Sequence, residues 1–84
     1  MKTRDERQYR YELRLNGDAF TIAMTSLNPQ NLTEADIKRK CPTLSEDEVS
    51  YVLARAKYDA RCSSDPSFCE LPPEAPIYND NKND

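Results

Sequence analysis

The side chains in this chain that could do covalent chemistry are three cysteine thiols, Cys41, Cys62 and Cys69. Cys62 and Cys69 enclose the segment CSSDPSFC, in which Pro66 favours a turn that would bring their two sulfurs together. They could therefore form a redox-sensitive pair that latches this segment. The alternative interpretation is that all three are ordinary free thiols of a reducing compartment, because an odd number of cysteines does not form a complete disulfide framework.

Other kinds of site are limited by what the composition lacks. The chain has no histidine, which is the commonest general base and metal ligand, and its single glycine rules out a glycine-rich phosphate loop. The three cysteines show no C-x-x-C spacing and would need another group as the fourth ligand to hold zinc. We therefore predict a protein that is not an enzyme, with no catalytic residue, no metal site and no cofactor.

Length and composition indicate one small domain. The 84 residues are 37% hydrophobic and 32% charged, with no apolar run long enough to cross a bilayer and no secretory signal after Met1. These features predict a cytoplasmic protein without a membrane partner. The net charge of −3 is uneven: residues 1–40 carry eight Lys and Arg against six Asp and Glu, whereas residues 41–84 carry four against nine. The basic front and the acidic rear could steer a partner or attract each other.

The residues from 8 to 26 carry the clearest pattern for a secondary structure. Large apolar residues alternate with polar or small ones on both sides of Asn16-Gly17, the dipeptide that a two-residue type I′ turn prefers. The pattern predicts an antiparallel β-hairpin in which Leu13 faces Phe20. Its apolar face would consist of Tyr9, Tyr11, Leu13, Leu15, Phe20, Ile22 and Met24.

Two helix starts follow, because a similar pattern of residues occurs twice. Thr33 and Ser45 are good N-cap residues, and an acidic residue stands three positions after each of them, Asp36 and Glu48. Each pair can form a capping box, in which the two residues satisfy each other's backbone N–H groups. An apolar residue just before each cap and another four positions after it can pack together as a hydrophobic staple.

The lengths of these two helices follow from proline and from apolar spacing. Pro42 cannot continue an α-helix, so the first helix is predicted for residues 34–40. The second is predicted for residues 46–61, with an apolar stripe that would cover the hairpin. That stripe contains Val49, Val52, Leu53, Ala56 and Ala60.

Together these elements predict an α+β fold, a small ββαα domain over residues 8–62 whose N-terminal antiparallel β-hairpin is covered by a short and a long helix. Residues 1–7 would form a flexible basic N-terminus. Residues 63–84 hold four of the six prolines and end in an Asn- and Asp-rich stretch, so we expect a disordered or extended acidic tail. The apolar residues that could anchor this tail to the domain or order it on a partner are Phe68, Leu71, Ile77 and Tyr78.

A lone two-stranded hairpin leaves both of its edges unpaired, which favours a protein partner. We predict a protein-binding module that regulates or inhibits another protein and can form a homodimer through the hairpin edge strands. Tyr51 and Tyr58 lie seven residues apart on the long helix and could form a contact surface, although tyrosines at the edge of a core show the same spacing. The predicted partner-binding residues are Arg10, Arg14, Tyr51, Tyr58, Phe68, Leu71, Ile77 and Tyr78.

Nucleic acid is the alternative partner. Arg10 and Arg14 on the polar face of the hairpin could enter a groove as part of a two-stranded ribbon, although Glu12 stands between them. A helix-turn-helix arrangement is disfavoured, because residues 46–48 at the start of the second helix are all acidic and would meet phosphates. The sequence therefore favours a protein partner over nucleic acid.

Overall fold

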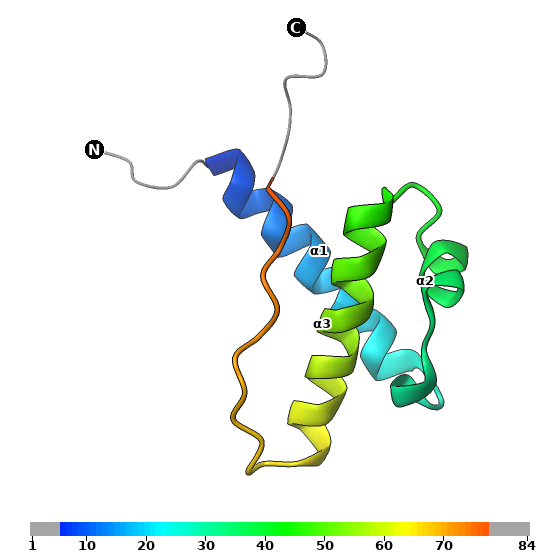
Figure 1. The fold of residues 1–84 in the computed structure, drawn as a ribbon, viewed down its shortest axis with the longest axis vertical. Helices are drawn as coiled ribbons and strands as arrows, with labels where there is room; N and C mark the ends of the chain where they lie inside the picture. Colours follow the sequence, from blue (N-terminus) through cyan, green and yellow to red (C-terminus); the bar gives the residue numbers. More distant parts are fainter. Residues whose placement is uncertain (1–5, 78–84) are drawn as a thin grey trace, which may run out of the picture.

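A computed structural model of the chain describes residues 6–77, in which all regular structure is helical. Two long helices, α1 (Glu6–Thr25) and α3 (Glu46–Ser64), lie across each other, and the short helix α2 (Glu34–Lys40) lies beside α3 (Figure 1). A 3-10 helix, η1 (Pro29–Asn31), stands between α1 and α2. After α3 the chain turns and runs back along this helix in an extended form.

The predicted β-hairpin is wrong, because its residues form the continuous helix α1. The helix passes through Asn16 and Gly17 without the positive φ angles that a type I′ turn requires at both positions. Ala19 and Ala23, which the hairpin placed on its polar face, are buried in the structure. Packing this side of α1 on α3 stabilises it as a helix, whereas an isolated hairpin is only marginally stable. The described residues therefore form an all-α fold and not a ββαα domain.

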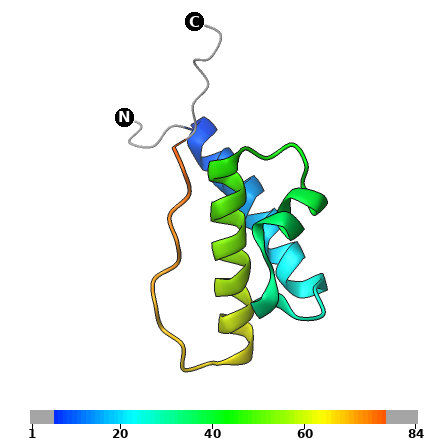
Figure 2. The ribbon, with the colours of Figure 1, turned by 45° about the vertical axis from the view of Figure 1, so that its right-hand side comes forward.

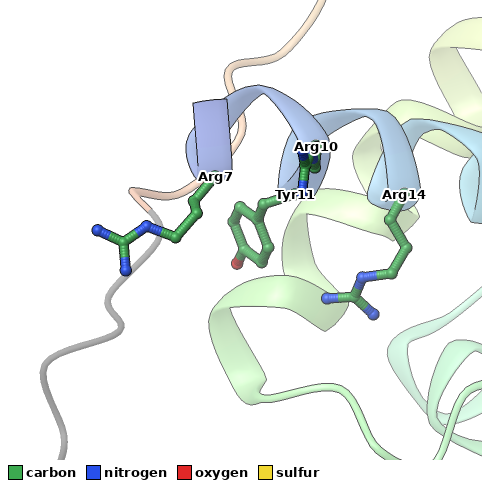
Figure 3. Close-up of a pocket in the computed structure, with 4 residues that line it drawn as sticks. All are labelled: Arg7, Arg10, Tyr11 and Arg14. Carbon is green, nitrogen blue, oxygen red and sulfur yellow. The ribbon is translucent and has the colours of Figure 1, made fainter. Parts of the chain in front are cut away.

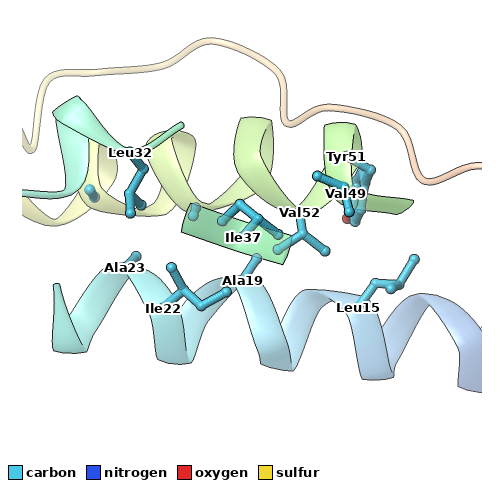
Figure 4. Packing of buried hydrophobic residues seen from close by; sticks show 11 residues of the cluster. Leu15, Ala19, Ile22, Ala23, Leu32, Ile37, Val49, Tyr51 and Val52 are labelled. Carbon is cyan, nitrogen blue, oxygen red and sulfur yellow. The ribbon is translucent and has the colours of Figure 1, made fainter. Parts of the chain in front are cut away.

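The core lies between α1 and α3 and extends under α2 (Figure 4). Alanines occupy several of the buried positions on both long helices, so the two backbones can approach closely. The partly exposed residues Leu44 and Leu53 pack at the margin of this core. The buried residues are Leu15, Ala19, Ile22, Ala23, Leu32, Ile37, Val49, Tyr51, Val52, Ala56 and Ala60.

Both predicted helix starts are confirmed, and each is held by a complete capping box. At α2 the Thr33 N–H donates to Asp36 Oδ2 at 3.0 Å, and the Asp36 N–H donates back to Thr33 Oγ1 at 3.3 Å. At α3 the Ser45 N–H donates to Glu48 Oε1 at 2.8 Å, and the Glu48 N–H donates to Ser45 Oγ at 3.3 Å. These hydrogen bonds satisfy backbone donors that the helices leave unpaired at their first turns.

The chain after α3 packs against the domain over residues 65–77. Figure 2 shows α3 between this extended segment on one side and α2 on the other. The segment is held near its start by Phe68, whose ring lies 5.6 Å from that of Tyr58 in an edge-to-face arrangement. Near its other end Ala75 packs against the core, and Gln8 Nε2 donates to the Pro76 carbonyl at 3.2 Å. This part of the predicted tail is therefore extended and docked.

We expect Ser45→Ala to lower the free energy of unfolding by about 1 kcal/mol, because it removes the side-chain acceptor for the Glu48 N–H. For a domain of this size such a loss lowers Tm by about 4–8 °C, which thermal unfolding followed by circular dichroism would measure. Ser50→Ala, at an exposed position of the same helix, is the matched control and should leave Tm unchanged or slightly raised. A wild-type Tm for Ser45→Ala would contradict the prediction.

Candidate interaction surface on helix α1

Helix α1 carries a second row of large apolar side chains beside the row that is buried in the core. We call this set the outer row; it consists of Tyr9, Leu13, Phe20 and Met24. Their spacings of four, seven and four residues place them on one side of an α-helix. Between 44% and 55% of each side chain is exposed, whereas the core-facing Leu15 and Ala19 are fully buried. The helix therefore carries two apolar rows, of which one is buried in the core and the other is about half exposed.

This arrangement explains why the sequence suggested a strand. A strictly alternating run places all its apolar residues on one face of a strand, but an α-helix divides the same residues between two faces. Tyr11 and Leu15 lie toward the core, while Tyr9 and Leu13 belong to the outer row. The spacing of Phe20 and Met24 did not distinguish the two structures, because residues four apart share a face in a helix and in a strand.

The only glycine of the chain lies in the middle of the outer row. Gly17 is exposed, and a Cβ atom added to it would meet nothing within 4 Å. Its φ angle is not positive, so an alanine would fit the same backbone. A glycine inside a helix costs roughly 0.5–1 kcal/mol relative to alanine. The described fold of the single chain therefore does not require glycine at this position.

A row of arginines runs beside the outer row in the first half of α1. Arg7, Arg10 and Arg14 surround Tyr11 in a shallow open hollow (Figure 3). The Arg14 guanidinium lies 5.7 Å from the centre of the Tyr11 ring and 3.6 Å from a carboxylate oxygen of Glu48. The structure thus brings the predicted residues Arg10 and Arg14 together, but on a helix and not on a hairpin face.

Glu48 links this arginine row to the start of α3. Partial burial raises the pKa of Glu48, but hydrogen bonds from Ser45 and Tyr11 together with the charge of Arg14 lower it further, so that the pKa lies below its ordinary value. Burial and the hydrogen bond to Glu48 raise the pKa of Tyr11 well above its ordinary range. At neutral pH Tyr11 is therefore a neutral donor to a charged Glu48, and this contact joins α1 to α3.

The two tyrosines predicted as a contact surface occupy different environments. Tyr51 is 6% exposed and donates its hydroxyl hydrogen bond to Asn16 Oδ1, so it belongs to the core. Tyr58 lies near the end of α3, where its hydroxyl donates to the Glu70 carbonyl at 3.1 Å. The Arg55 guanidinium lies 5.5 Å from the centre of the Tyr58 ring. Tyr58 thus holds the extended segment, and the structure does not bring the two tyrosines into one surface patch.

The predicted residues after α3 are divided between docked and exposed positions. Phe68 is partly buried against Tyr58, and the Arg61 guanidinium lies 4.8 Å from the centre of its ring. Leu71 and Ile77 are 90% and 82% exposed. Tyr78 lies outside the described residues. Among Phe68, Leu71 and Ile77, which the structure describes, Phe68 is the anchor to the domain.

Both predicted redox cysteines are exposed free thiols in this structure. Cys62 is at the end of α3 and Cys69 is in the extended segment. The nearby Cys62 thiol and partial burial raise the pKa of the Tyr58 hydroxyl. The third cysteine, Cys41, is partly buried, and burial raises the pKa of its thiol. The pairing of Cys62 with Cys69 stays a prediction.

Two other kinds of site, a metal centre and a membrane span, are absent from residues 6–77. No three Cys, Asp or Glu side chains of this range gather in a way that could hold a metal ion. Neither long helix has the unbroken apolar stretch that a bilayer span needs. Comparison of the chain with protein-family models, curated proteins and solved structures finds no match in any of the three. The outer row and the arginine row of α1 are therefore the basis for a functional proposal.

The link between Glu48 and α1 predicts a dependence of stability on pH. Because the folded-state pKa of Glu48 lies below the ordinary value of 4.5, the stabilisation is present above that value and is lost as pH falls through the folded-state pKa. We expect Glu48→Gln to be less stable than wild type at about pH 6, and to lose less stability between about pH 6 and about pH 3. Urea unfolding at a series of pH values measures both effects.

Glu46→Gln is the matched control, because it removes an exposed carboxylate from the same helical turn and changes the net charge equally. The free energy of unfolding of Glu46→Gln should change with pH more nearly as it does in the wild type. If wild type and Glu48→Gln lose the same stability between about pH 6 and about pH 3, Glu48 is not the group responsible for this loss.

Proposed function

We propose that this chain is a non-enzymatic protein-binding module and that its binding surface is the outer row of α1. The observation that carries this proposal is the line of four large apolar side chains on α1, each about half exposed, beside the row that is buried in the core. Half of four side chains with roughly 200 Å² of surface each leaves about 400 Å² of exposed apolar surface. Patches of that size on a small protein are commonly interaction sites.

The composition of this surface also fits a protein interface. Tyrosine, phenylalanine and methionine are enriched in such interfaces, and arginine is enriched together with them. Here Arg10 and Arg14 lie beside the apolar residues and could form a polar rim. The surface is straight and borne on one helix, so a matching partner surface is another helix with an apolar side.

We infer that the outer row acts by covering part of another protein's surface, which is the action of a regulator or an inhibitor. We place it in the cytoplasm, because the exposed thiols of Cys62 and Cys69 suit a reducing compartment. The earlier proposal of pairing through hairpin edges does not apply to a helix, whose backbone groups are paired internally.

The proposal predicts where a partner will be cross-linked. A photo-reactive amino acid introduced at Leu13 or Phe20 of the full chain should cross-link to a bound protein in cells of the organism that makes this chain. The same amino acid at Ala35, which is exposed on α2, is the matched control and should not. Adding Met24→Asp to the Leu13 probe should reduce the cross-link at least about tenfold, because a charge would be buried at the contact. Equal cross-linking at all three positions would contradict the proposal.

Nucleic acid is a second candidate partner, and the arginine row is the observation that favours it. Arg7, Arg10 and Arg14 follow one another at helical spacing along an open surface. Phosphate contacts from such a row would supply affinity without base specificity. The ion pairs that Arg10 makes with Glu6 and Arg14 with Glu48 compete with this role, so the apolar outer row remains the primary candidate.

A gel shift separates the two candidates. If the arginine row binds nucleic acid, the chain should shift duplex DNA or RNA at about 50 mM salt and weaken steeply by about 200 mM. Arg10→Gln should weaken that binding, while Arg39→Gln, an exposed arginine on α2, should leave it unchanged. No shift at about 50 mM salt would eliminate this candidate.

A further inference from the structure

We propose that the outer row of α1 binds the outer row of a second copy of this chain, with the two α1 helices antiparallel. This inference rests on the proposed function, since it names the partner of the same surface. Three observations carry it: the symmetry of the outer row, the position of the glycine, and the distribution of charge along α1.

The outer row is symmetric about the peptide bond between Asn16 and Gly17. Tyr9 precedes this point by as many residues as Met24 follows it, and Leu13 and Phe20 are related in the same way. Because residues rise evenly along a helix, two antiparallel copies that cross here place Tyr9 level with Met24 of the second copy and Leu13 level with Phe20. A two-fold dimer requires such self-complementarity. The aromatic contacts with Met24 and Leu13 are favourable pairings.

Gly17 lies next to the centre of this symmetric row. The single chain does not need a glycine there, because a Cβ atom would meet nothing within 4 Å and the φ angle is not positive. A second helix that crosses α1 at this point gains from the glycine, because the side chains at a helix contact set the distance between the packed helices. A glycine at the crossing lets the two backbones approach and brings the flanking apolar side chains into contact.

The charges of α1 suit an antiparallel partner. Its last turn has no basic residue to offset the partial negative charge of the helix end. In the antiparallel pair Arg10 of one copy comes level with Ala23 of the other, close to that end. The two helix dipoles also oppose each other in this orientation. A parallel pair would place the arginine rows side by side and the uncompensated ends together.

The area of the outer row is sufficient for a specific dimer. Two copies would bury about 800 Å² of apolar surface, and because the buried core of an interface is about 65% apolar, the total is about 1,200 Å². That value is at the lower limit of the range for specific interfaces. Interfaces at this lower limit are typical of weak and transient complexes, so we expect a Kd in the micromolar range.

Light scattering after gel filtration of the full chain tests the proposal. At about 100 µM, well above a micromolar Kd, the mass should approach twice the 9.7 kDa of one chain. Leu13→Asp should be monomeric, while Ala35→Asp, which places the same charge at an exposed residue of α2, should remain dimeric. Circular dichroism must show that both variants keep their helices, and Phe20→Ser provides a milder second change at the same surface. A monomeric wild type, or a dimeric Leu13→Asp with its helices intact, overturns the proposal.

Gly17→Ala distinguishes a role of Gly17 in the dimer from a role in the single chain. In the single chain the change should raise Tm, because alanine is the better helix former and the added methyl group meets nothing. In the dimer the same methyl group lies at the crossing, and the dimer Kd should rise at least about tenfold. An unchanged dimer Kd would show that the helices do not cross at Gly17 and would overturn the proposed geometry.

Disulfide cross-linking determines the orientation. In a background with the three native cysteines replaced, a mixture of Leu13→Cys and Phe20→Cys chains should oxidise to a mixed dimer. Leu13→Cys alone should not cross-link, because two copies of residue 13 would stand seven residues apart along the antiparallel pair, about 10 Å. Efficient self-linking of Leu13→Cys would show a parallel pair and overturn the antiparallel assignment.

The antiparallel dimer and the protein-binding function can be disproved separately. If the wild type is monomeric at about 100 µM but photo-cross-linking at Leu13 still joins it to a different protein, the self-pairing is wrong and the protein-binding function stands. If Leu13 and Phe20 cross-link neither to a second copy nor to another protein, both proposals are wrong.

Discussion

The contact between α1 and α3 is the interaction on which the other elements of this fold depend. Leu15 and Ala19 on α1, and Val52 and Ala56 on α3, are all fully buried, and small residues among them let the two helices lie close together. α2 and the extended segment pack on the sides of α3, and η1 touches both long helices. A chain this short has little other apolar surface to bury, so its stability depends on this one contact.

Polar interactions determine where the helices begin and how they are joined. The capping boxes at Thr33 and Ser45 start α2 and α3 at defined residues. Glu48 takes part in the second box and also accepts from Tyr11 and pairs with Arg14, both on α1. One carboxylate therefore contributes to a helix start and to the contact between helices. This double role accounts for its lowered pKa despite partial burial.

One row of α1 residues is buried in the core, and a second apolar row of the same helix stays about half exposed. The inner residues are small or aliphatic and fit against α3, while the outer row contains two aromatic rings and a methionine. Aromatic residues are used where a surface must gain much contact area from few side chains. The arginines beside the outer row extend it with charge. Both proposals for this protein follow from a half-exposed apolar row on α1 beside the row that is buried in the core.

Sequence patterns alone determined the local features whose causes lie within a few residues. The starts of α2 and α3, the end of α2 before Pro42 and the buried stripe of α3 were all predicted, because capping and helical spacing act locally. Tertiary structure decided the state of residues 6–25, where an alternating pattern around Asn16-Gly17 suits a hairpin equally well. The burial of Ala19 and Ala23 on α3 selected the helix, because it depends on residues some thirty positions away. That choice also created the outer row, which no local pattern could identify as exposed.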